Sequence, residues 1–352
     1  MGNDNGEQSV ATMDQTQPFL DSSDIIDDGR ELARRMDRDG YLVVRGLLNP
    51  DRIFALRQRF LTIAYKAGWL HTDSPLNEAT ADPSSFCVEP EDPYMEIIRR
   101  MNRIEEFHAL QHDPALVGLL ERMCGEPILP HPRLITRAIF PRRDAFTTPP
   151  HQDFIPIQGT PDTYTAWFPL GDLPSSMGGV EIAEGSHVGG LYDFQPGLGA
   201  GGIEITESFE GRWRGGSFAA GDVLFFHSMA VHRGVPNKTD ALRLSVDSRY
   251  QKISEPIAPG SLLPHTKPQT WDEIYADWPA DSPYRNYWST LNLQVEEYDD
   301  SYHGKRDDMA LEMAAQGDPR SRSVLQRIVA RDPDPTKREQ AQSLLDALPT
   351  TP

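Results

Sequence analysis

A histidine and a carboxylate lie two residues apart near the middle of the chain, in the segment Pro-Pro-His-Gln-Asp-Phe at 149–154. On an extended segment, His151 and Asp153 project from the same face, because strand side chains repeat every two residues. An imidazole and a carboxylate are two of the three ligands in the facial triad that binds non-haem Fe(II) and leaves three coordination positions open. Such pairs also occur by chance, so the hypothesis requires a third ligand.

Two downstream histidines are candidates for that third ligand. His227 and His232 are five residues apart, so on an unbroken strand they face opposite ways and only one can join the site. Arg243 follows His232 by eleven residues, on a strand expected to return beside the metal. Its guanidinium suits bidentate binding of the far carboxylate of a dicarboxylate. The spacing favours His232 as the ligand and predicts that His227 lies in the core or supports the ligands.

These residues and their flanking motifs resemble the phytanoyl-CoA dioxygenase family of Fe(II)/2-oxoglutarate-dependent oxygenases. The matching elements occur in this order: His151-x-Asp153, Trp167 in the segment 165–172, Gly-Gly-Val-Glu-Ile-Ala-Glu-Gly-Ser-His at 178–187, Gly221-Asp222, His232 and Arg243. The resemblance covers about residues 35–255. Glu184 stands where the family commonly has the proline of Pro-Gly-Ser-His, a departure that touches no ligand.

The resemblance implies a mainly β fold with flanking helices, built on a double-stranded β-helix (jelly-roll, cupin-like) core. It implies Fe(II) as the metal, with 2-oxoglutarate and O2 as co-substrates. The residues implied for iron are His151, Asp153 and His232, and those implied for 2-oxoglutarate are Arg243, Ser245, Thr165 and Trp167. Ser245 is included because it lies two residues after Arg243, on the same face of the strand.

The implied reaction hydroxylates, or otherwise oxidises, an unactivated C–H bond of a small molecule, with decarboxylation of 2-oxoglutarate to succinate and CO2. Asp153 disfavours halogenation, because in the related halogenases a small residue replaces this carboxylate and opens a position for chloride. We expect a bacterial or fungal secondary metabolite, an amino-acid derivative or a compatible solute as substrate. The acidic composition argues against an acyl-CoA, since only Arg142-Arg143 indicates a basic cluster.

Three other classes of protein stay open. A metal-dependent, cupin-type enzyme that is not an oxygenase could use two histidines and a carboxylate, and would be active without 2-oxoglutarate. A catalytically silent binding protein could also be built on the same fold. The cupin-type alternative does not account for Arg243 at its offset from His232, and a silent binding protein would be expected to lack a ligand, whereas all three are present. An oxygenase that modifies a macromolecule would need a broad binding face, for which the helical C-terminal tail is the candidate.

The glycine-rich segment 188–220 predicts either a lid over the site or a loop whose Trp213 packs at a subunit contact. Trp213, Gln152 and His227 are therefore candidates for contacts with the substrate or the lid. The run Gly-Leu-Gly-Ala-Gly-Gly at 197–202 matches GxGxxG, but it leads into a strand-like run instead of a helix. It predicts a loop and not a dinucleotide site.

Composition limits the partners. The chain has 34 Lys and Arg against 53 Asp and Glu, a formal net charge of −19, which disfavours nucleic acid and anionic lipid. No segment reaches the roughly 18 apolar residues of a membrane span, and the N-terminus lacks the pattern of a signal peptide. The two cysteines, Cys87 and Cys124, form no CxxC pair. These features predict a cytoplasmic protein that binds a small molecule, and neither nucleic acid nor membrane.

The elements that must position these residues fall into four zones. We expect a disordered segment at 1–27, a helical buttress at 28–128, a jelly-roll catalytic core at 129–255, and a Pro- and acid-rich, then helical, extension at 256–352 that packs on the core or on a second copy of the chain. Helices are predicted at 28–38, 51–67, 94–111 and 114–123, and from 307 onward. Strands are predicted at 41–44, 133–140, 164–170, 180–183, 222–226 and 242–250.

Overall fold

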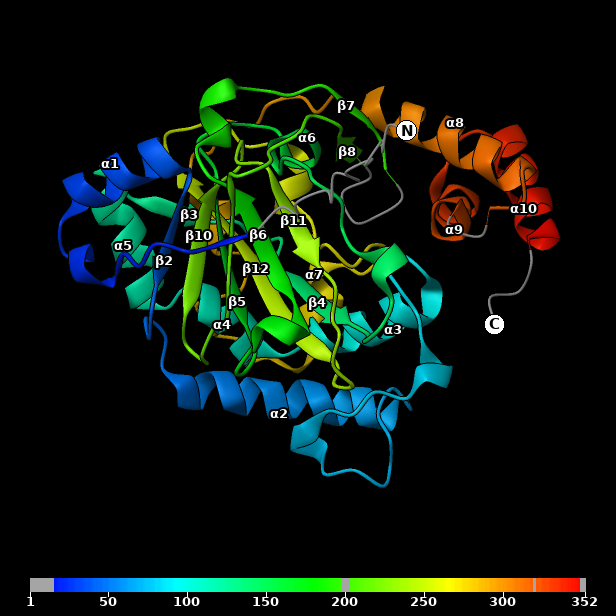
Figure 1. Cartoon of the computed structure of the whole chain (residues 1–352), viewed down its shortest axis with the longest axis horizontal. Helices are drawn as coiled ribbons and strands as arrows, with labels where there is room; N and C mark the ends of the chain where they lie inside the picture. Colours follow the sequence, from blue (N-terminus) through cyan, green and yellow to red (C-terminus); the bar gives the residue numbers. More distant parts are fainter. Residues whose placement is uncertain (1–15, 198–202, 300, 319–320, 349–352) are drawn as a thin grey trace, which may run out of the picture.

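The computed structural model describes residues 16–197, 203–299, 301–318 and 321–348. Its helices are α1 (Gly29–Asp39), α2 (Pro50–Lys66), α3 (Asp92–Met101), α4 (Glu105–Gln111), α5 (Pro114–Cys124), α6 (Phe154–Ile157), α7 (Trp271–Ile274), α8 (Ser301–Ala315), α9 (Arg322–Arg331) and α10 (Pro335–Ala347). Its strands are β1 (Gln17–Pro18), β2 (Tyr41–Val44), β3 (Ile128–Pro130), β4 (Ile135–Ile139), β5 (Tyr164–Pro169), β6 (Gly179–Ala183), β7 (Phe194–Pro196), β8 (Ile203–Ile205), β9 (Trp213–Gly215), β10 (Val223–His227), β11 (His232–Val235) and β12 (Arg243–Lys252). The strands occupy the middle of the molecule, α2 runs below them, and α8–α10 form a group at one side (Figure 1).

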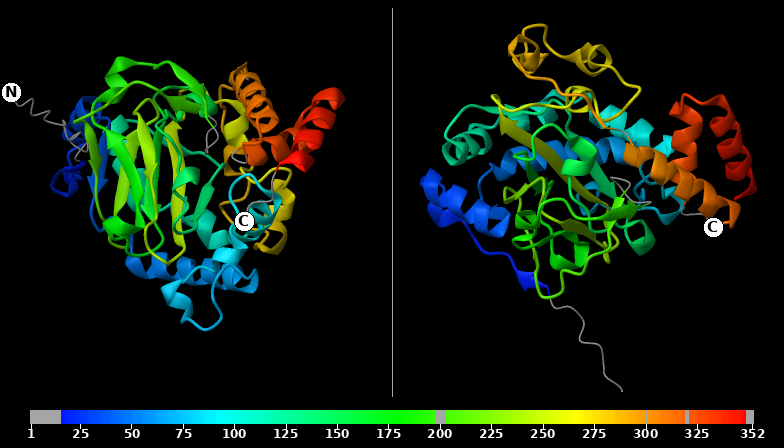
Figure 2. Two further views of the ribbon diagram at one scale, coloured as in Figure 1. Left: turned by 45° about the vertical axis from the view of Figure 1, so that its right-hand side comes forward. Right: turned by 90° about the horizontal axis from the view of Figure 1, so that it is seen from above.

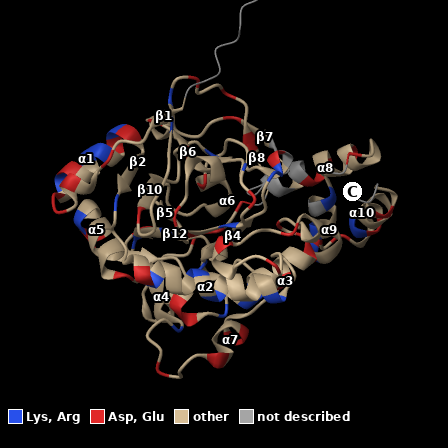
Figure 3. Cartoon of the chain, turned by 60° about the horizontal axis from the view of Figure 1, so that its bottom comes forward, with Lys and Arg blue, Asp and Glu red and all other residues tan. Residues whose placement is uncertain are grey.

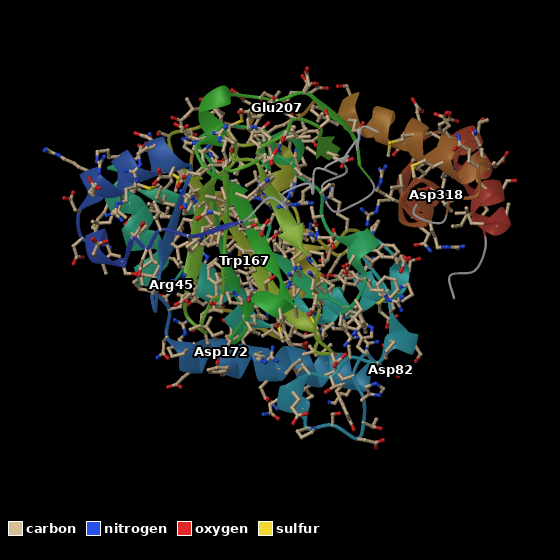
Figure 4. All side chains as sticks on the ribbon, viewed as in Figure 1. Arg45, Asp82, Trp167, Asp172, Glu207 and Asp318 are labelled. Carbon is tan, nitrogen blue, oxygen red and sulfur yellow. The ribbon has the colours of Figure 1, made fainter. Side chains whose placement is uncertain are left out.

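Two sheets form the β-rich core. The larger sheet has the order β2-β10-β5-β12-β3, and β4 also pairs with β12. The smaller sheet has the order β1-β9-β6-β11, and β7 and β8 pair separately. The sheets pack on each other through an apolar cluster that includes Val43, Trp167 and Leu224 of the larger sheet and Ile182 of the smaller. Trp167 lies among the central strands in Figure 4.

The opposite face of the larger sheet is covered by helices. Phe168 and Val246 of this sheet belong to the same buried cluster as Leu32 of α1, Phe60 of α2 and Leu120 of α5. Alternate residues of β5 therefore serve two different cores, since Trp167 faces the smaller sheet and Phe168 faces the helices. Figure 2 shows the resulting layers of strands and helices from two sides. Acidic and basic residues are mixed along α1, whereas α2 carries basic residues and a single acidic residue near its start (Figure 3).

The helix predicted at 94–111 is wrong in one respect, because it is two helices, α3 and α4. The backbone carbonyl of Asn102 accepts a hydrogen bond from the His108 ring Nε2 (2.8 Å), and the Asn102 side chain donates to Thr266 Oγ1 (2.9 Å). The first bond occupies a carbonyl that a continuous helix would use four residues on. A local bond from His108 thus accompanies the break, and the bond to Thr266 adds a contact with a distant segment.

Part of the segment expected to be disordered, 1–27, contains regular structure, a strand at Gln17–Pro18 and a 3-10 helix at Ser23–Ile25. Gln17–Pro18 form β1, which pairs in parallel with β9. Residues 1–15 lie outside the described residues, as does the GxGxxG run after its first glycine. Among the helices that the structure describes, none combines the length and apolar character needed to cross a bilayer.

The C-terminal extension has an apolar cluster of its own. Ala310 of α8, Leu325 and Ile328 of α9, and Ala341 of α10 are buried against one another. The guanidinium of Arg331 at the end of α9 donates from Nη2 to the Lys267 carbonyl oxygen (3.0 Å), which ties the helices to the segment after β12. α8 also contacts β7, so the extension packs on the core of its own chain.

Candidate metal centre

A backbone bridge brings His151 and His232 together. His151 N donates to the His232 carbonyl oxygen (2.9 Å), and His232 N donates to the His151 carbonyl oxygen (3.0 Å). The segment before α6 is thereby added beside β11 at the edge of the smaller sheet. Residues directly opposite in an antiparallel pair present their side chains on one face, and the two imidazole centroids are 4.1 Å apart.

Asp153 completes a cluster of three. Its Oδ1 lies 4.0 Å from His151 Nε2 and 3.9 Å from His232 Nε2. All three residues are buried, and one ligand atom from each lies within 4.8 Å of the others. The His-x-Asp spacing places both side chains together even though Asp153 lies at the start of the short helix α6 and not on a strand.

Both imidazoles are oriented by carbonyl groups. His151 Nδ1 lies 2.8 Å from the Pro149 carbonyl oxygen, and His232 Nδ1 lies 3.0 Å from the Ala230 carbonyl oxygen. A carbonyl only accepts, so each Nδ1 carries the proton and each Nε2 offers its lone pair. Burial lowers the pKa of His151 to about 3 and also lowers the pKa of His232, which keeps both rings neutral.

Asp153 is held by two neighbours. Arg249 Nη2 donates to Oδ1 (3.1 Å) and Arg249 Nε donates to Oδ2 (3.3 Å), while Thr165 Oγ1 donates to Oδ2 (2.8 Å). Burial alone would raise the pKa of Asp153, but the guanidinium of Arg249 lowers it below its ordinary value. The carboxylate is therefore ionised. Arg249 was missed in the sequence, although it continues the alternation that begins with Arg243 and Ser245.

This donor set fits a divalent metal. Two neutral imidazole nitrogens and one carboxylate oxygen face the same point, and no fourth His, Cys, Asp or Glu joins the cluster within the described part of the chain. Such a set matches the two-histidine, one-carboxylate arrangement that leaves positions open for other ligands. The hydrogen bonds on both Nδ1 atoms and on Asp153 are the supporting contacts that such ligands usually have.

Arg243 and Ser245 lie buried on β12 with unpartnered polar atoms. Arg243 Nη1 donates to the Val235 carbonyl oxygen (3.2 Å), but its Nε and the Ser245 hydroxyl have no hydrogen-bond partner among the described residues. Burial lowers the pKa of Arg243 to about 10. Val235 is three residues beyond His232 on β11, about 10 Å along the strand. An anionic group between the triad and Arg243 would satisfy both atoms.

Three other candidates lie elsewhere. Trp167 packs between the sheets against Phe218, with ring centroids 5.1 Å apart. His227 is outside the triad, at the end of β10, where its Nε2 is 3.5 Å from Asp162 Oδ1. Gln152 is fully buried, and its side chain links two loops by donating hydrogen bonds to the Gly190 and Met229 carbonyl oxygens. The structure therefore gives Gln152 a structural contact and not an exposed position facing a substrate.

Trp213 corrects the expectation for the segment 188–220. It lies on β9, where it is buried with Phe209 and Val231, and the Arg233 guanidinium lies 3.9 Å from its ring centroid. It is thus part of the chain's own core, and neither a lid residue nor an exposed subunit contact. The segment also contains β7 and β8. The sequence showed the tryptophan but not the neighbouring strands that enclose it.

A cavity of about 460 Å³ opens from the triad. His151, Asp153 and Arg249 line its buried end, and Lys267 and Arg331 are among the residues that line the rest. The expectation that no basic cluster exists beyond Arg142-Arg143 is therefore wrong. Basic residues far apart in the sequence gather here only after folding.

The chain belongs to the family described as Phytanoyl-CoA dioxygenase (PhyH), whose match covers residues 36–245. It is accordingly a non-haem iron enzyme that depends on 2-oxoglutarate, with Fe(II) and 2-oxoglutarate as its cofactor and co-substrate.

Among its relatives is the 1-deoxypentalenic acid 11-beta-hydroxylase of Streptomyces exfoliatus, 26% identical over 71% of this chain and 91% of that protein. The peroxisomal phytanoyl-CoA dioxygenase of Bos taurus is 22% identical over 62% of this chain and 67% of that protein. A solved structure of the epimerase SnoN in complex with Fe3+, alpha ketoglutarate and nogalamycin RO aligns with a TM-score of 0.47. It is 23% identical and covers 66% of this chain and 86% of that one.

Proposed function

We propose that the protein hydroxylates a C–H bond of a small organic molecule, with iron held by His151, Asp153 and His232. The observation that carries this proposal is the convergence of the three buried side chains, one ligand atom from each within 4.8 Å. Iron bound there would activate O2 while 2-oxoglutarate is decarboxylated to succinate and CO2. The relative from Streptomyces exfoliatus is named as a hydroxylase of a small acid, which supports a small-molecule substrate.

The chain's own residues prepare the site before any ligand arrives. The Pro149 and Ala230 carbonyl groups hold each imidazole with Nε2 directed at the shared point. Arg249 and Thr165 fix both oxygens of Asp153. Burial excludes water from this end of the cavity, so charged interactions there are stronger than at the surface. We also propose that the two sheets are the halves of a double-stranded β-helix, which their largely antiparallel pairing supports.

The proposal is tested by succinate release. With Fe(II), 2-oxoglutarate and a panel of small metabolites, the purified protein should form succinate, and its rate should rise with the true substrate. Omission of either Fe(II) or 2-oxoglutarate should stop the reaction. Turnover of a substrate without 2-oxoglutarate would instead favour a cupin-type enzyme of another class.

Arg243→Met is predicted to weaken 2-oxoglutarate binding by at least about tenfold while iron binding changes little. Arg243 offers a buried guanidinium with a free Nε, and methionine fills a similar volume without a charge. The visible charge-transfer band of the anaerobic Fe(II) complex, titrated with 2-oxoglutarate, measures the affinity. Arg142→Met, which removes an exposed arginine paired with Asp240, is the control. Unchanged 2-oxoglutarate affinity would remove Arg243 from the site.

Thr165→Val is predicted to lower Fe(II) affinity by about tenfold, because a hydrogen bond that orients a metal ligand is lost. Thr165→Ser keeps the hydroxyl and should bind Fe(II) nearly as the parent does. Both affinities can be read from anaerobic metal titrations in the absence of 2-oxoglutarate. If the valine and serine variants behave alike, the hydroxyl of Thr165 does not support Asp153 in the way proposed.

A further inference from the structure

The cavity that ends at the triad has its exposed end in the C-terminal extension. His151, Asp153 and Arg249 at one end are buried, whereas Lys267 and Arg331 at the other are exposed. The family match ends at residue 245, so the exposed end is built from chain outside that match. Lys267 comes from the segment after β12, and Arg331 is the last residue of α9.

Positive charge is concentrated along this cavity. The basic residues that line it are Arg133, Arg137, Arg249, Lys267, Arg327 and Arg331, whereas its acidic residues are Glu89 and Asp153. The whole chain, in contrast, carries a formal net charge of −19. A cavity lined by one sign of charge attracts ligands of the other sign.

Three of the arginines that line the cavity are already neutralised. Arg249 pairs with Asp153, and Arg137 pairs with Glu89 through Nη1 (2.9 Å). On α9, Arg327 pairs with Asp307 of α8. These three cations therefore have local counter-charges in the folded chain.

Lys267 and Arg331 differ from them. No described carboxylate lies within ion-pair distance of either, and they are neighbours because Arg331 Nη2 donates to the Lys267 carbonyl oxygen. Burial and then Arg133 and Arg331 lower the pKa of Lys267, which shows that its surroundings are cationic. Burial and then Arg327 and Arg99 lower the pKa of Arg331, and Glu89 and Asp92 offset part of that effect without pairing with it. An anion placed between the two groups would relieve this repulsion.

The wall of the cavity is partly apolar. Met95, Ile135, Ile157 and Leu263 are among the residues that line the cavity. A ligand that fills it would therefore have an apolar body and one anionic end.

We propose that the substrate is a small molecule with an oxyanion group, a carboxylate or a phosphate monoester, which binds Lys267 and Arg331 while its apolar body extends toward the triad. The inference rests on the proposed function, because it takes the triad as the reaction centre. The oxyanion is distinct from 2-oxoglutarate, since the residue assigned to that co-substrate, Arg243, does not line this cavity.

The test uses the full-length protein with saturating Fe(II) and 2-oxoglutarate under anaerobic conditions. Calorimetry measures binding of a panel built on decyl, naphthyl and adamantyl bodies, each bearing a carboxylate, a phosphate monoester, a methyl ester or an ammonium group. An anionic member should bind at least about tenfold more tightly than its methyl ester, and this preference should shrink in high salt. Whichever of the carboxylate and phosphate ligands binds more tightly identifies the kind of oxyanion group that the substrate carries.

The double variant Lys267→Met/Arg331→Met should reduce the preference to within about twofold. The control variant Arg30→Met/Lys238→Met removes the same amount of charge from two exposed residues away from the cavity. It should keep the full preference for the anionic ligand over its methyl ester. The inference is overturned if a neutral or cationic member binds most tightly, if no member binds, or if the first double variant keeps the preference. The charge-transfer band, recorded in the same samples, separates the two proposals. Its absence contradicts the proposed function, whereas its presence without an anion preference contradicts this inference alone.

Discussion

His232→Ala should abolish Fe(II) binding at micromolar metal and reduce succinate formation by at least about 1,000-fold, because a bound metal is worth several kcal/mol of transition-state stabilisation. His232 contributes one of three ligand atoms, and no other described His, Cys, Asp or Glu is close enough to replace it. Asp153→Ala should have the same effect. Anaerobic Fe(II) titration with 2-oxoglutarate, followed by the charge-transfer band, measures the loss.

His227→Ala is the matched control. Both histidines come from the segment 223–235, but His227 is at the end of β10, and its ring lies beside Asp162. Asp162 is half exposed, so loss of this pair should cost less than about 1 kcal/mol in the free energy of unfolding. The band should persist in His227→Ala. A band that is lost in His227→Ala and kept in His232→Ala would exchange the roles of the two residues.

Spacing along single strands could be read from the sequence. The strand predicted at 41–44 coincides with β2, the one at 164–170 is one residue longer than β5, and the one at 222–226 is shifted by one residue from β10. The convergence of His151, Asp153 and His232 followed from the family pattern, whereas the two-residue strand period does not apply at Asp153, which begins α6. In each case the information is local or is carried by a repeated motif.

Contacts between distant segments could not be read in the same way. Asn102 follows α3 and bonds with His108 and with the distant Thr266, although the apolar pattern continues without a break. Trp213 is enclosed by residues of other strands. Lys267 and Arg331 meet across 64 residues of chain, so no window of sequence contains the basic cluster.

Arg249 is an intermediate case. Arg243, Ser245, Asp247 and Arg249 alternate along one strand, and all four are buried in the structure. The rule that grouped Ser245 with Arg243 would also have placed Arg249 on the face of the site. Nothing in the sequence shows that a second guanidinium six residues after Arg243 is buried, because such burial is costly without a partner. Asp153 is that partner.

Arg249→Leu should lower the free energy of unfolding of the metal-free protein by about 3–5 kcal/mol, because it leaves a buried carboxylate without its counter-charge. The exposed fractions of the two side chains are 7% and 6%, so water screens the pair very little. Thr165 alone would remain on Asp153, through Oδ2. Denaturant unfolding with and without metal measures the effect. Saturating Fe(II) should recover part of the loss, since the cation then supplies the missing charge.

The same substitution tests whether Arg249 positions Asp153 for the metal. Two effects oppose each other, since removal of Arg249 ends its competition with the metal for the carboxylate but also frees that carboxylate to rotate. Loss of a supporting contact to a metal ligand typically lowers metal affinity by about 10–100-fold, so we expect orientation to dominate and Fe(II) affinity to fall by that amount. Arg249→Lys restores the charge without the two-pronged contact and should give an intermediate affinity.

Arg45→Leu separates this effect from general destabilisation. Arg45 also pairs with a buried carboxylate, Asp222 (2.8 Å), but Asp222 keeps hydrogen bonds from the Gly46 and Ala219 backbone N–H groups. Loss of the Arg45 side chain should lower the free energy of unfolding by about 1 kcal/mol and leave Fe(II) affinity unchanged. If Arg249→Leu lowers stability by less than 1 kcal/mol and binds Fe(II) within about threefold of the parent, Arg249 neither neutralises nor orients Asp153. A fall in Fe(II) affinity shared equally by both variants would show that the metal responds to stability alone.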